Sequence, residues 1–210
     1  MKNLVIIGAG GMGRTMYSNA IESVGYEIDF SVKGFIDDNL NALNGFPNYP
    51  PLLGTIKGYQ PQPDDVFVSS IGGAKRKTCM EDIISKGGEF WALIHKTARI
   101  YTNAKLGKGN FIGAFTVVGN DAQIGDYNMI QSYTVIGHDA IIGNWNRLDT
   151  NVTCVGGVII EDEVSIHSSA VISHDVTVGT GAHIGALSFV IRNVKPGTTV
   201  YGNPAKKLEL

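Results

Sequence analysis

His138 of this chain is followed directly by a carboxylate, in the pair His138-Asp139. A carboxylate that binds one ring nitrogen fixes the tautomer of an imidazole and raises the basicity of the other nitrogen. The pair can therefore act as a general base, which removes a proton from an attacking nucleophile. Side chains of consecutive strand residues point apart, so this pairing requires a corner of the chain. A surface histidine with ordinary hydrogen bonds is the alternative for His138.

A glycine-rich turn near the N-terminus is suited to bind phosphate. Gly8, Gly10 and Gly13 follow an apolar run at residues 4–7 and precede a helix predicted over residues 14–24. This order matches the fingerprint of dinucleotide-binding folds, in which backbone N–H groups meet phosphate at a helix N-terminus. A purely structural tight turn is the alternative.

Two further predicted strands also end in residues suited to a binding site. Asp37 and Asp38 follow a strand predicted over residues 32–36, and Gly72 follows one predicted over residues 66–71. Parallel sheets bind ligands beyond the carboxyl ends of their strands. A carboxylate there can accept a hydrogen bond from a ribose or a base, and a glycine allows a close approach to its backbone. A solvated turn is the alternative for the two aspartates.

The first 95 residues alternate between predicted strands and helices. A helix over residues 75–85 and a short strand over residues 90–94 complete the series. The alternation predicts a small parallel sheet with flanking helices, a Rossmann-like half domain over residues 1–95. A dinucleotide site needs two such halves, so we expect this domain to hold a nucleotide or nucleotide-sugar rather than NAD.

The remainder of the chain carries a six-residue repeat. An aliphatic residue recurs at every sixth position from Ile100 to Val190, with Cys154 as the one near-substitute. A period of six fits neither an amphipathic helix nor a half-buried strand, and it predicts a parallel β-helix. Three hexapeptides make one coil of eighteen residues, so the sixteen repeats predict about five coils stacked ~4.8 Å apart.

Counting by eighteen places possible substrate contacts on this prism. Gly156 is the stacked neighbour of His138, where the missing side chain leaves room for a substrate carbonyl and the N–H can stabilise an oxyanion. Thr150, Ser168 and Ala186 form a column of small residues. A shallow groove there could receive an extended ligand such as pantetheine, and packing against another subunit would explain the column equally well.

Composition limits the class of protein. The net charge of −2 provides no basic field for nucleic acid. The apolar run at residues 4–7 is too short for a signal peptide or a membrane span, so we expect a cytoplasmic protein. Cys79 and Cys154 are isolated in the sequence and are expected to be reduced structural residues. We also expect an oligomer, because terminal coils of repeat proteins need covering.

The hexapeptides, the segment around His138-Asp139 at residues 135–143 and the exit at residues 201–206 resemble left-handed β-helix acyltransferases. With the glycine-rich N-terminal half included, essentially the whole chain resembles the PglD- and NeuD-like family. That family contains UDP-4-amino-sugar N-acetyltransferases and sialic acid O-acetyltransferases.

The resemblance implies a homotrimer with active sites between neighbouring prisms, acetyl-CoA along the β-helix and no metal. It also implies a nucleotide-sugar-binding domain at residues 1–95 and a β-helix acyltransferase domain with a C-terminal tail at residues 96–210. By likeness, His138 matches the catalytic base and Asp139 its acidic helper. The sugar-nucleotide positions are matched by Gly10, Gly11, Met12, Asp37, Asp38 and Gly72, and the acetyl-CoA contacts by Arg147, Gly156, Ser168 and Ala186.

Three residues depart from the family pattern. Met12 stands where the glycine loop of the family often has histidine, and Arg147 replaces a second active-site histidine. The arginine could change the acceptor or pair with a CoA phosphate. Asp139 in place of the glutamate of some relatives is a milder change.

The function expected from this resemblance is acetyl transfer from acetyl-CoA to the amino group of a nucleotide-linked 4-amino-sugar, in a surface-glycan pathway. O-acetylation of sialic acid or another sugar hydroxyl is the nearest alternative. Alternatives of another class are a non-catalytic nucleotide-binding scaffold and a metal-dependent hydratase. His167, His174 and His183 raise the hydratase, but they are seven and nine residues apart, whereas β-helix carbonic anhydrases pair two ligands five residues apart.

Overall fold

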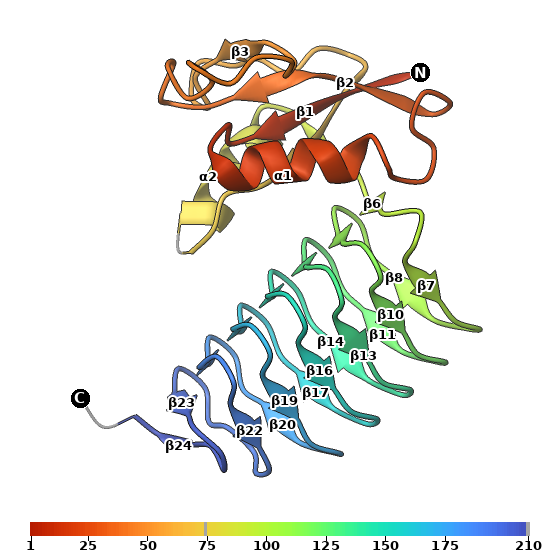
Figure 1. The fold of residues 1–210 in the computed structure, drawn as a ribbon, viewed down its shortest axis with the longest axis vertical. Helices are drawn as coiled ribbons and strands as arrows, with labels where there is room; N and C mark the ends of the chain where they lie inside the picture. Colours follow the sequence, from red (N-terminus) through yellow and green to blue (C-terminus); the bar gives the residue numbers. More distant parts are fainter. Residues whose placement is uncertain (74, 209–210) are drawn as a thin grey trace. The chain divides into compact units, whose positions relative to one another are not determined.

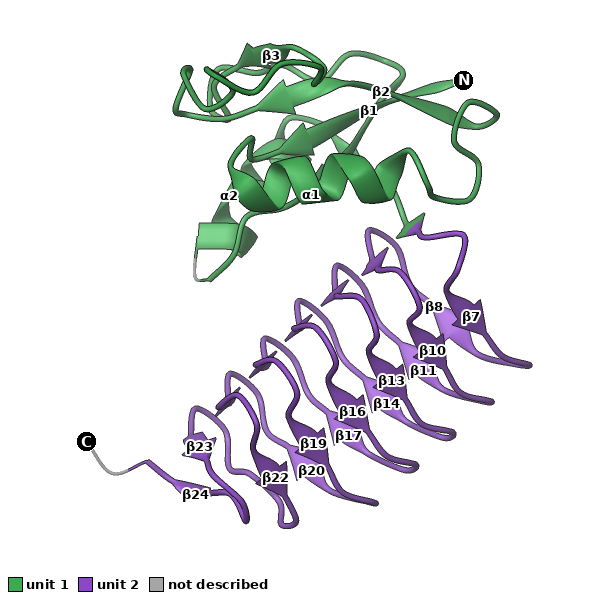
Figure 2. Ribbon diagram, in the orientation of Figure 1, with its two compact units in different colours: residues 1–93 green, residues 94–210 purple. Residues whose placement is uncertain are grey.

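The computed structural model describes residues 1–73 and 75–208. The chain forms two compact units, Met1–Leu93 and Ile94–Leu210, which are coloured separately in Figure 2. The predicted combination of an α/β unit with a parallel β-helix is confirmed. Within the described residues, no helix is long and apolar enough to cross a membrane.

The first unit is a five-stranded parallel sheet with strand order β3-β2-β1-β4-β5 (Figure 1). Residues 4–7 of β1 are fully buried, because this strand lies at the centre of the sheet between β2 and β4. The strands are β1 Lys2–Ile7, β2 Phe30–Ile36, β3 Leu52–Gly54, β4 Asp65–Ser69 and β5 Glu89–Phe90, and the helices are α1 Gly11–Ala20 and α2 Lys75–Ser85.

Three details of this unit differ from the sequence prediction. Helix α1 begins at Gly11 instead of residue 14, because the extended backbone of Gly10 ends the preceding loop there. Strand β3 has no predicted counterpart, since three residues after two prolines are too few to show a period. The strand predicted over residues 90–94 is two strands in different sheets, of which β5 pairs with β4 and β6 belongs to the prism.

The second unit is a left-handed parallel β-helix with three faces. The first face contains β7, β10, β13, β16, β19 and β22, and the second contains β8, β11, β14, β17 and β20. The third contains β6, β9, β12, β15, β18, β21, β23 and β24. Their bounds are β6 Leu93–Ile94, β7 Arg99–Ile100, β8 Lys105–Leu106, β9 Phe111–Ile112, β10 Val117–Val118, β11 Gln123–Ile124, β12 Met129–Ile130, β13 Val135–Ile136, β14 Ile141–Ile142, β15 Arg147–Leu148, β16 Thr153–Cys154, β17 Ile159–Ile160, β18 Ser165–Ile166, β19 Val171–Ile172, β20 Thr177–Val178, β21 His183–Ile184, β22 Phe189–Val190, β23 Thr199–Tyr201 and β24 Lys206–Lys207.

Residues eighteen apart are stacked neighbours, as the period predicts. Val117 pairs with Val135 on the first face and Ile142 with Ile160 on the second. The aliphatic residues of the repeat fill the interior, and Cys154 is completely buried among them. The hydrophobic period therefore sets both the core and the register of the prism.

Buried asparagines add a polar ladder inside one corner. The Oδ1 of Asn110 accepts the backbone N–H of Asn128 at 2.8 Å, the Oδ1 of Asn128 accepts that of Asn146 at 2.8 Å, and the Oδ1 of Asn146 accepts that of Val164 at 2.7 Å. Each amide thus satisfies a buried N–H of the next coil. This explains why Asn110, Asn128 and Asn146 recur at a spacing of eighteen in the interior of the prism.

Each corner of the prism contains a residue in the left-handed backbone region, where Asn, Asp and Gly are favoured. We number the corners by the faces they join. Corner 1 joins the first and second faces, corner 2 the second and third, and corner 3 the third and first. The left-handed residues are Asn103, Asp121, Asp139, Gly157 and Asp175 at corner 1, Gly109, Tyr127, Trp145, Glu163 and Gly181 at corner 2, and Phe115, Tyr133, Asn151, Ser169 and Leu187 at corner 3.

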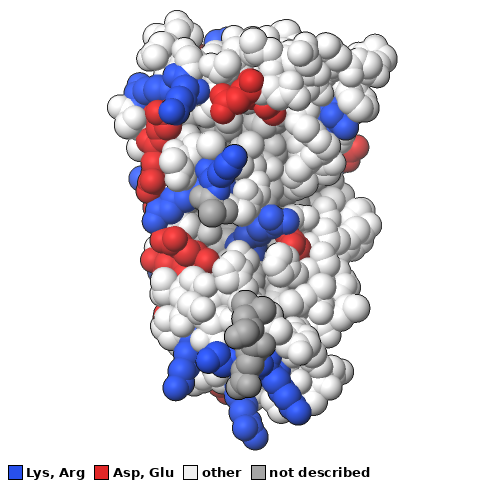
Figure 3. Space-filling view, turned by 90° about the vertical axis from the view of Figure 1, so that its left-hand side faces the viewer, with Lys and Arg blue, Asp and Glu red and all other residues white. Residues whose placement is uncertain are grey.

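The surface charge is mixed. On the face drawn in Figure 3, acidic and basic side chains are interspersed over most of the view, and basic side chains gather at its lower end.

Candidate active site

The structure brings His138 and Asp139 together at corner 1. The Nδ1 of His138 lies 2.6 Å from the Oδ2 of Asp139. The left-handed conformation of Asp139, with φ of 57°, provides the corner that this pairing requires. Both side chains are 66% exposed. The carboxylate thus occupies Nδ1 and leaves Nε2 for a substrate.

Gly156 lies one coil further along corner 1, directly against the imidazole. A β-carbon at this position would come within 2.5 Å of the Nε2 of His138 and within 2.6 Å of its Cε1. The glycine therefore makes room for the imidazole of His138 itself, in addition to the room for a substrate carbonyl that the sequence predicts. Its N–H donates to no other described residue, so it is free to meet an oxyanion.

The residues matched to acetyl-CoA divide between two edges of the prism. Gly156 follows β16 into corner 1, whereas Ser168 follows β18 and Ala186 follows β21 into corner 3. Ser168 and Ala186 lie in adjacent coils, because the N–H of Leu187 donates to the carbonyl of Ser168 at 3.0 Å. One chain alone does not bring all of these residues to the same edge as His138.

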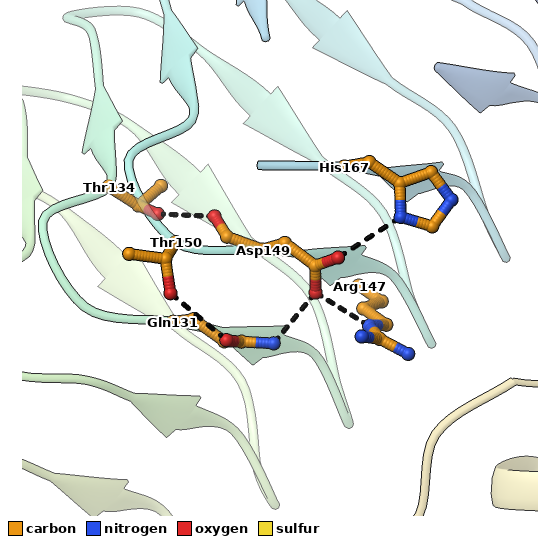
Figure 4. A network of polar contacts seen from close by, with 6 residues as sticks. All are labelled: Gln131, Thr134, Arg147, Asp149, Thr150 and His167. Carbon is orange, nitrogen blue, oxygen red and sulfur yellow. Dashed lines mark hydrogen bonds and ion pairs between the residues drawn. The ribbon is translucent and has the colours of Figure 1, made fainter. Parts of the chain in front are cut away.

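Arg147, which opens β15 on the third face, binds an acidic partner that the sequence analysis did not identify. Its Nε donates to the Oδ1 of Asp149 at 2.7 Å. The Oδ2 of Asp149 contacts the Nδ1 of His167 (Figure 4), and these two atoms are 3.1 Å apart. His167 was considered in the sequence only as one of three possible metal ligands. Counting by eighteen from Asp149 would have found it.

The sugar-nucleotide positions of the first unit gather at one edge of its sheet. Gly10, Gly11 and Met12 follow β1, Asp37 and Asp38 follow β2, and Gly72 follows β4. These three strands are adjacent in the sheet. Their carboxyl ends therefore meet at the edge where parallel sheets bind ligands.

The glycines of this turn serve two different purposes. A β-carbon on Gly8 would come within 2.6 Å of the Ser70 hydroxyl, and one on Gly13 would clash with the carbonyl of Gly8. Gly10 and Gly11 have no atom within 4 Å of an added β-carbon. The first turn of α1 has neither a side-chain cap nor an acidic residue, so its N–H groups are open to an anion.

The two aspartates also hold the turn in place. The Oδ2 of Asp37 accepts the N–H of Ala9 at 2.7 Å, and its Oδ1 accepts the N–H of Asn39 at 2.8 Å. The Oδ1 of Asp38 accepts the N–H of Ile56 at 3.1 Å. Each of these oxygens retains a further lone pair. The carboxylates therefore have a structural role in addition to any contact with a ribose or base.

A polar hollow lies on the same edge of the prism as His138. It has a volume of about 460 Å³ and is lined by Asn103, Ala104, Lys105, Asp121 and Gln123. Asp121 occupies the corner 1 position one coil before Asp139. Donors and acceptors of this kind suit the hydroxyl groups of a sugar.

Neither cysteine is suited to act as a nucleophile. Complete burial raises the pKa of the Cys154 thiol to about 12. The pKa of Cys79 is raised by burial first and then by the nearby charges of Asp38 and Asp82. A reactive thiolate needs the opposite surroundings. Among residues 1–73 and 75–208, no three His, Cys, Asp or Glu side chains gather as a metal-ligand set.

Comparisons with known proteins agree with this architecture. Residues 3–83 match the PglD N-terminal domain family. A GDP-perosamine N-acetyltransferase from Escherichia coli O157:H7 is 30% identical over 217 aligned positions, which cover 97% of this chain and 95% of that protein. A 2,3,4,5-tetrahydropyridine-2,6-dicarboxylate N-acetyltransferase from Staphylococcus aureus is 48% identical, but over 52 residues, which are 25% of this chain and 22% of that protein.

Solved structures match over the full length. PerB from Caulobacter crescentus, in complex with CoA and GDP-perosamine, superposes with a TM-score of 0.88 at 23% identity, covering 100% of this chain and 98% of that chain. The acetyltransferase domain of PglB from Neisseria gonorrhoeae, in complex with acetyl coenzyme A, superposes with a TM-score of 0.86 at 25% identity, covering 99% of both. Because the 30% identical relative aligns over nearly the whole of both sequences, this protein belongs to the PglD-like family of hexapeptide-repeat sugar N-acetyltransferases.

Proposed function

We propose that this protein transfers the acetyl group of acetyl-CoA to the amino group of a nucleotide-linked 4-amino-sugar. The observation that carries the proposal is the His138-Asp139 pair, held at 2.6 Å with Nε2 against Gly156. The full-length relationship to a GDP-perosamine N-acetyltransferase supports the substrate class.

The chemistry is direct transfer with His138 as general base. Nε2 removes a proton as the amine attacks the thioester carbonyl, and Asp139 keeps the Nδ1–H tautomer and stabilises the imidazolium. The N–H of Gly156 binds the oxyanion of the tetrahedral intermediate. The C–S bond then breaks, and the CoA thiolate leaves with the proton that His138 returns. The raised thiol pKa values of both cysteines are consistent with a route that forms no acyl-cysteine.

The complete site forms between subunits of a homotrimer. His138 and Gly156 lie at corner 1, and Ser168 and Ala186 lie at corner 3. Acetyl-CoA therefore meets corner 3 of one prism and corner 1 of its neighbour. Val135, Ile141 and Ile159 are 38–45% exposed on the first and second faces, and they provide apolar surface for such contact. Sedimentation equilibrium measures the subunit number directly.

The acceptor is held by the first unit. Its nucleotide phosphates meet the N–H groups of Gly10, Gly11 and Met12, while Asp37, Asp38 and Gly72 line the same sheet edge. We assign the enzyme to the cytoplasm, where acetyl-CoA and nucleotide-sugars are available, and to the synthesis of a surface glycan.

The test is a thiol-release assay with acetyl-CoA and a panel of UDP-, GDP- and dTDP-linked 4-amino-sugars. Mass spectrometry of the product locates the new acetyl group. We expect an N-acetylated sugar with one of the three nucleotides. Acetylation of the corresponding 4-hydroxy sugars or of sialic acid, with no transfer to any amine, would contradict the proposal in favour of O-acetylation.

A further inference from the structure

Asp149 is the centre of a polar network on the third face and corner 3 (Figure 4). Its Oδ1 accepts from the Nε2 of Gln131 at 2.7 Å and from the Nε of Arg147 at 2.7 Å, and its Oδ2 lies 3.1 Å from the Nδ1 of His167. Thr150 donates to the Oε1 of Gln131 at 3.1 Å. The proposed chemistry at corner 1 uses none of these side chains.

The carboxylate of Asp149 orients the neighbouring side chains and is too buried to bind a ligand itself. The Asp149 side chain is 9% exposed, whereas that of His167 is 46% exposed and that of Arg147 is 31% exposed. Three donors surround the carboxylate, which therefore accepts the Nδ1–H of His167 and leaves Nε2 of this ring unbound. Arg147 likewise uses Nε and keeps its two terminal nitrogens. In Figure 4, the Nε2 of His167 and the terminal nitrogens of Arg147 lie on the side of Asp149 turned away from Thr134 and Thr150.

A purely stabilising role explains this arrangement poorly. A partly buried ion pair loses much of its Coulombic gain to desolvation, and an apolar replacement is often equally stable. The cluster instead presents the open fork of a guanidinium next to an imidazole. The terminal nitrogens of arginine bind phosphate oxygens in bidentate fashion, and an imidazolium adds a third donor. Ser168, next in sequence to His167, belongs to the proposed acetyl-CoA groove.

We propose that Arg147 and His167, positioned by Asp149, form a subsite for a phosphate oxyanion of a substrate. The inference rests on the proposed function, in which both substrates carry pyrophosphate. Either CoA or the nucleotide of the sugar supplies the oxyanion. The chemistry is the same in both cases, and binding measurements distinguish the two sources.

The first test compares Arg147→Met with wild-type protein by calorimetry. The probes are CoA, phosphate-free pantetheine, GDP, UDP, dTDP and inorganic pyrophosphate. Loss of a charge-assisted bidentate contact is expected to weaken binding about 10- to 100-fold. If CoA supplies the oxyanion, affinity falls for CoA and not for pantetheine. If the nucleotide supplies it, affinity falls for one nucleoside diphosphate and not for CoA.

Arg99→Met is the matched control, because Arg99 is an exposed arginine on the first face. It should bind every probe as wild type does. Arg147→Lys keeps the charge but lacks the fork, and intermediate affinity is expected. Thermal unfolding of each variant separates a loss of the subsite from a loss of the fold.

His167 is tested with two amides of different length. Asn in place of His167 can still donate to Asp149 but carries nothing at the position of Nε2, whereas Gln reaches that position. We expect His167→Asn to raise the KM of the phosphate-bearing substrate several-fold at similar kcat, and His167→Gln to recover part of the loss. A merely structural histidine would not show this KM-against-kcat separation.

If Arg147→Met and His167→Asn both bind every probe with wild-type affinity, the proposal of a phosphate subsite is wrong. A failure of the proposed function is seen separately, because wild-type protein would then release no thiol with any acceptor. Pyrophosphate binding reports on the oxyanion subsite in either case.

Discussion

Two His–Asp contacts among the described residues of the prism differ in almost every respect. His138 and Asp139 are adjacent in sequence, 2.6 Å apart and both 66% exposed. His167 and Asp149 are eighteen residues apart and separated by 3.1 Å, and the carboxylate side chain is 9% exposed. The first carboxylate serves one imidazole, while the second also binds Arg147 and Gln131. An exposed carboxylate with one partner suits proton transfer, and a buried carboxylate that accepts from three side chains suits the positioning of donors.

The largest effect on kcat should come from substitution of His138, the histidine of the exposed pair. His138→Ala removes the base, so kcat is expected to fall by about 10²–10⁴-fold, with little change in acetyl-CoA affinity. His167→Ala removes no base in our proposal and should leave kcat within about tenfold. Steady-state kinetics with saturating acceptor measures both. Equal losses of kcat in the two variants would erase the distinction between the pairs.

Substitution of Gly156 tests whether kcat depends on the position of the His138 imidazole. Gly156→Ala places a methyl group 2.5 Å from Nε2 and should displace the ring, which lowers kcat by about 10- to 100-fold. Gly185→Ala is the matched control, because its β-carbon would approach Tyr201 at 2.9 Å. That variant should lose some thermal stability and keep its kcat. An unchanged kcat in Gly156→Ala would argue against a fixed base.

Removal of the two carboxylate charges should affect different quantities. Asp139→Asn keeps the size of the side chain but removes the negative charge beside the imidazolium that forms during the proposed reaction, so kcat should fall about tenfold or more. Asp149→Asn leaves Arg147 without its partner and should cost about 1–3 kcal/mol of unfolding free energy, with KM affected more than kcat. Urea unfolding and kinetics on the same samples check both. The comparison fails if Asp149→Asn leaves stability and KM unchanged.

The smallest effect on stability is expected from Thr150, which reaches the His167–Asp149 pair only through Gln131. Thr150→Val removes the hydroxyl that donates to Gln131 at 3.1 Å, and the loss should be about 0.5–1 kcal/mol of unfolding free energy. Ser132→Ala is the control, because this hydroxyl has no hydrogen bond to a described residue. A Thr150→Val variant as stable as Ser132→Ala would show that Gln131 needs no support.

Much of the fold could be predicted from periodicity alone. The aliphatic period of six identified the prism, and the count of eighteen found the contact of Gly156 with His138. The short strand β3 and the early start of α1 escaped prediction, because neither produces a periodic pattern. The close approach of the His138 ring to Gly156 was not predicted in this detail, since the direction in which an imidazole points depends on its rotamer.

The candidate site was predictable where its residues are neighbours along the chain or lie on strand ends. The His138-Asp139 pair and the clustering of Gly10, Asp37 and Gly72 at adjacent strand ends follow from that order. The network of Asp149 was not predicted, although its histidine lies at the expected spacing of eighteen. A spacing alone does not show that two side chains bond rather than face solvent.

The sequence by itself determined the prism, its stacking register and the adjacency of the exposed pair. The hydrophobic period identifies the residues that must be buried and therefore the stacking of the coils. The adjacency of His138 and Asp139 is given by the chain itself. Tertiary structure alone decided that Asp149 collects Gln131, Arg147 and His167. The contacts with Gln131 and His167 join different coils, and the geometry of all three depends on rotamers and burial that no linear pattern records.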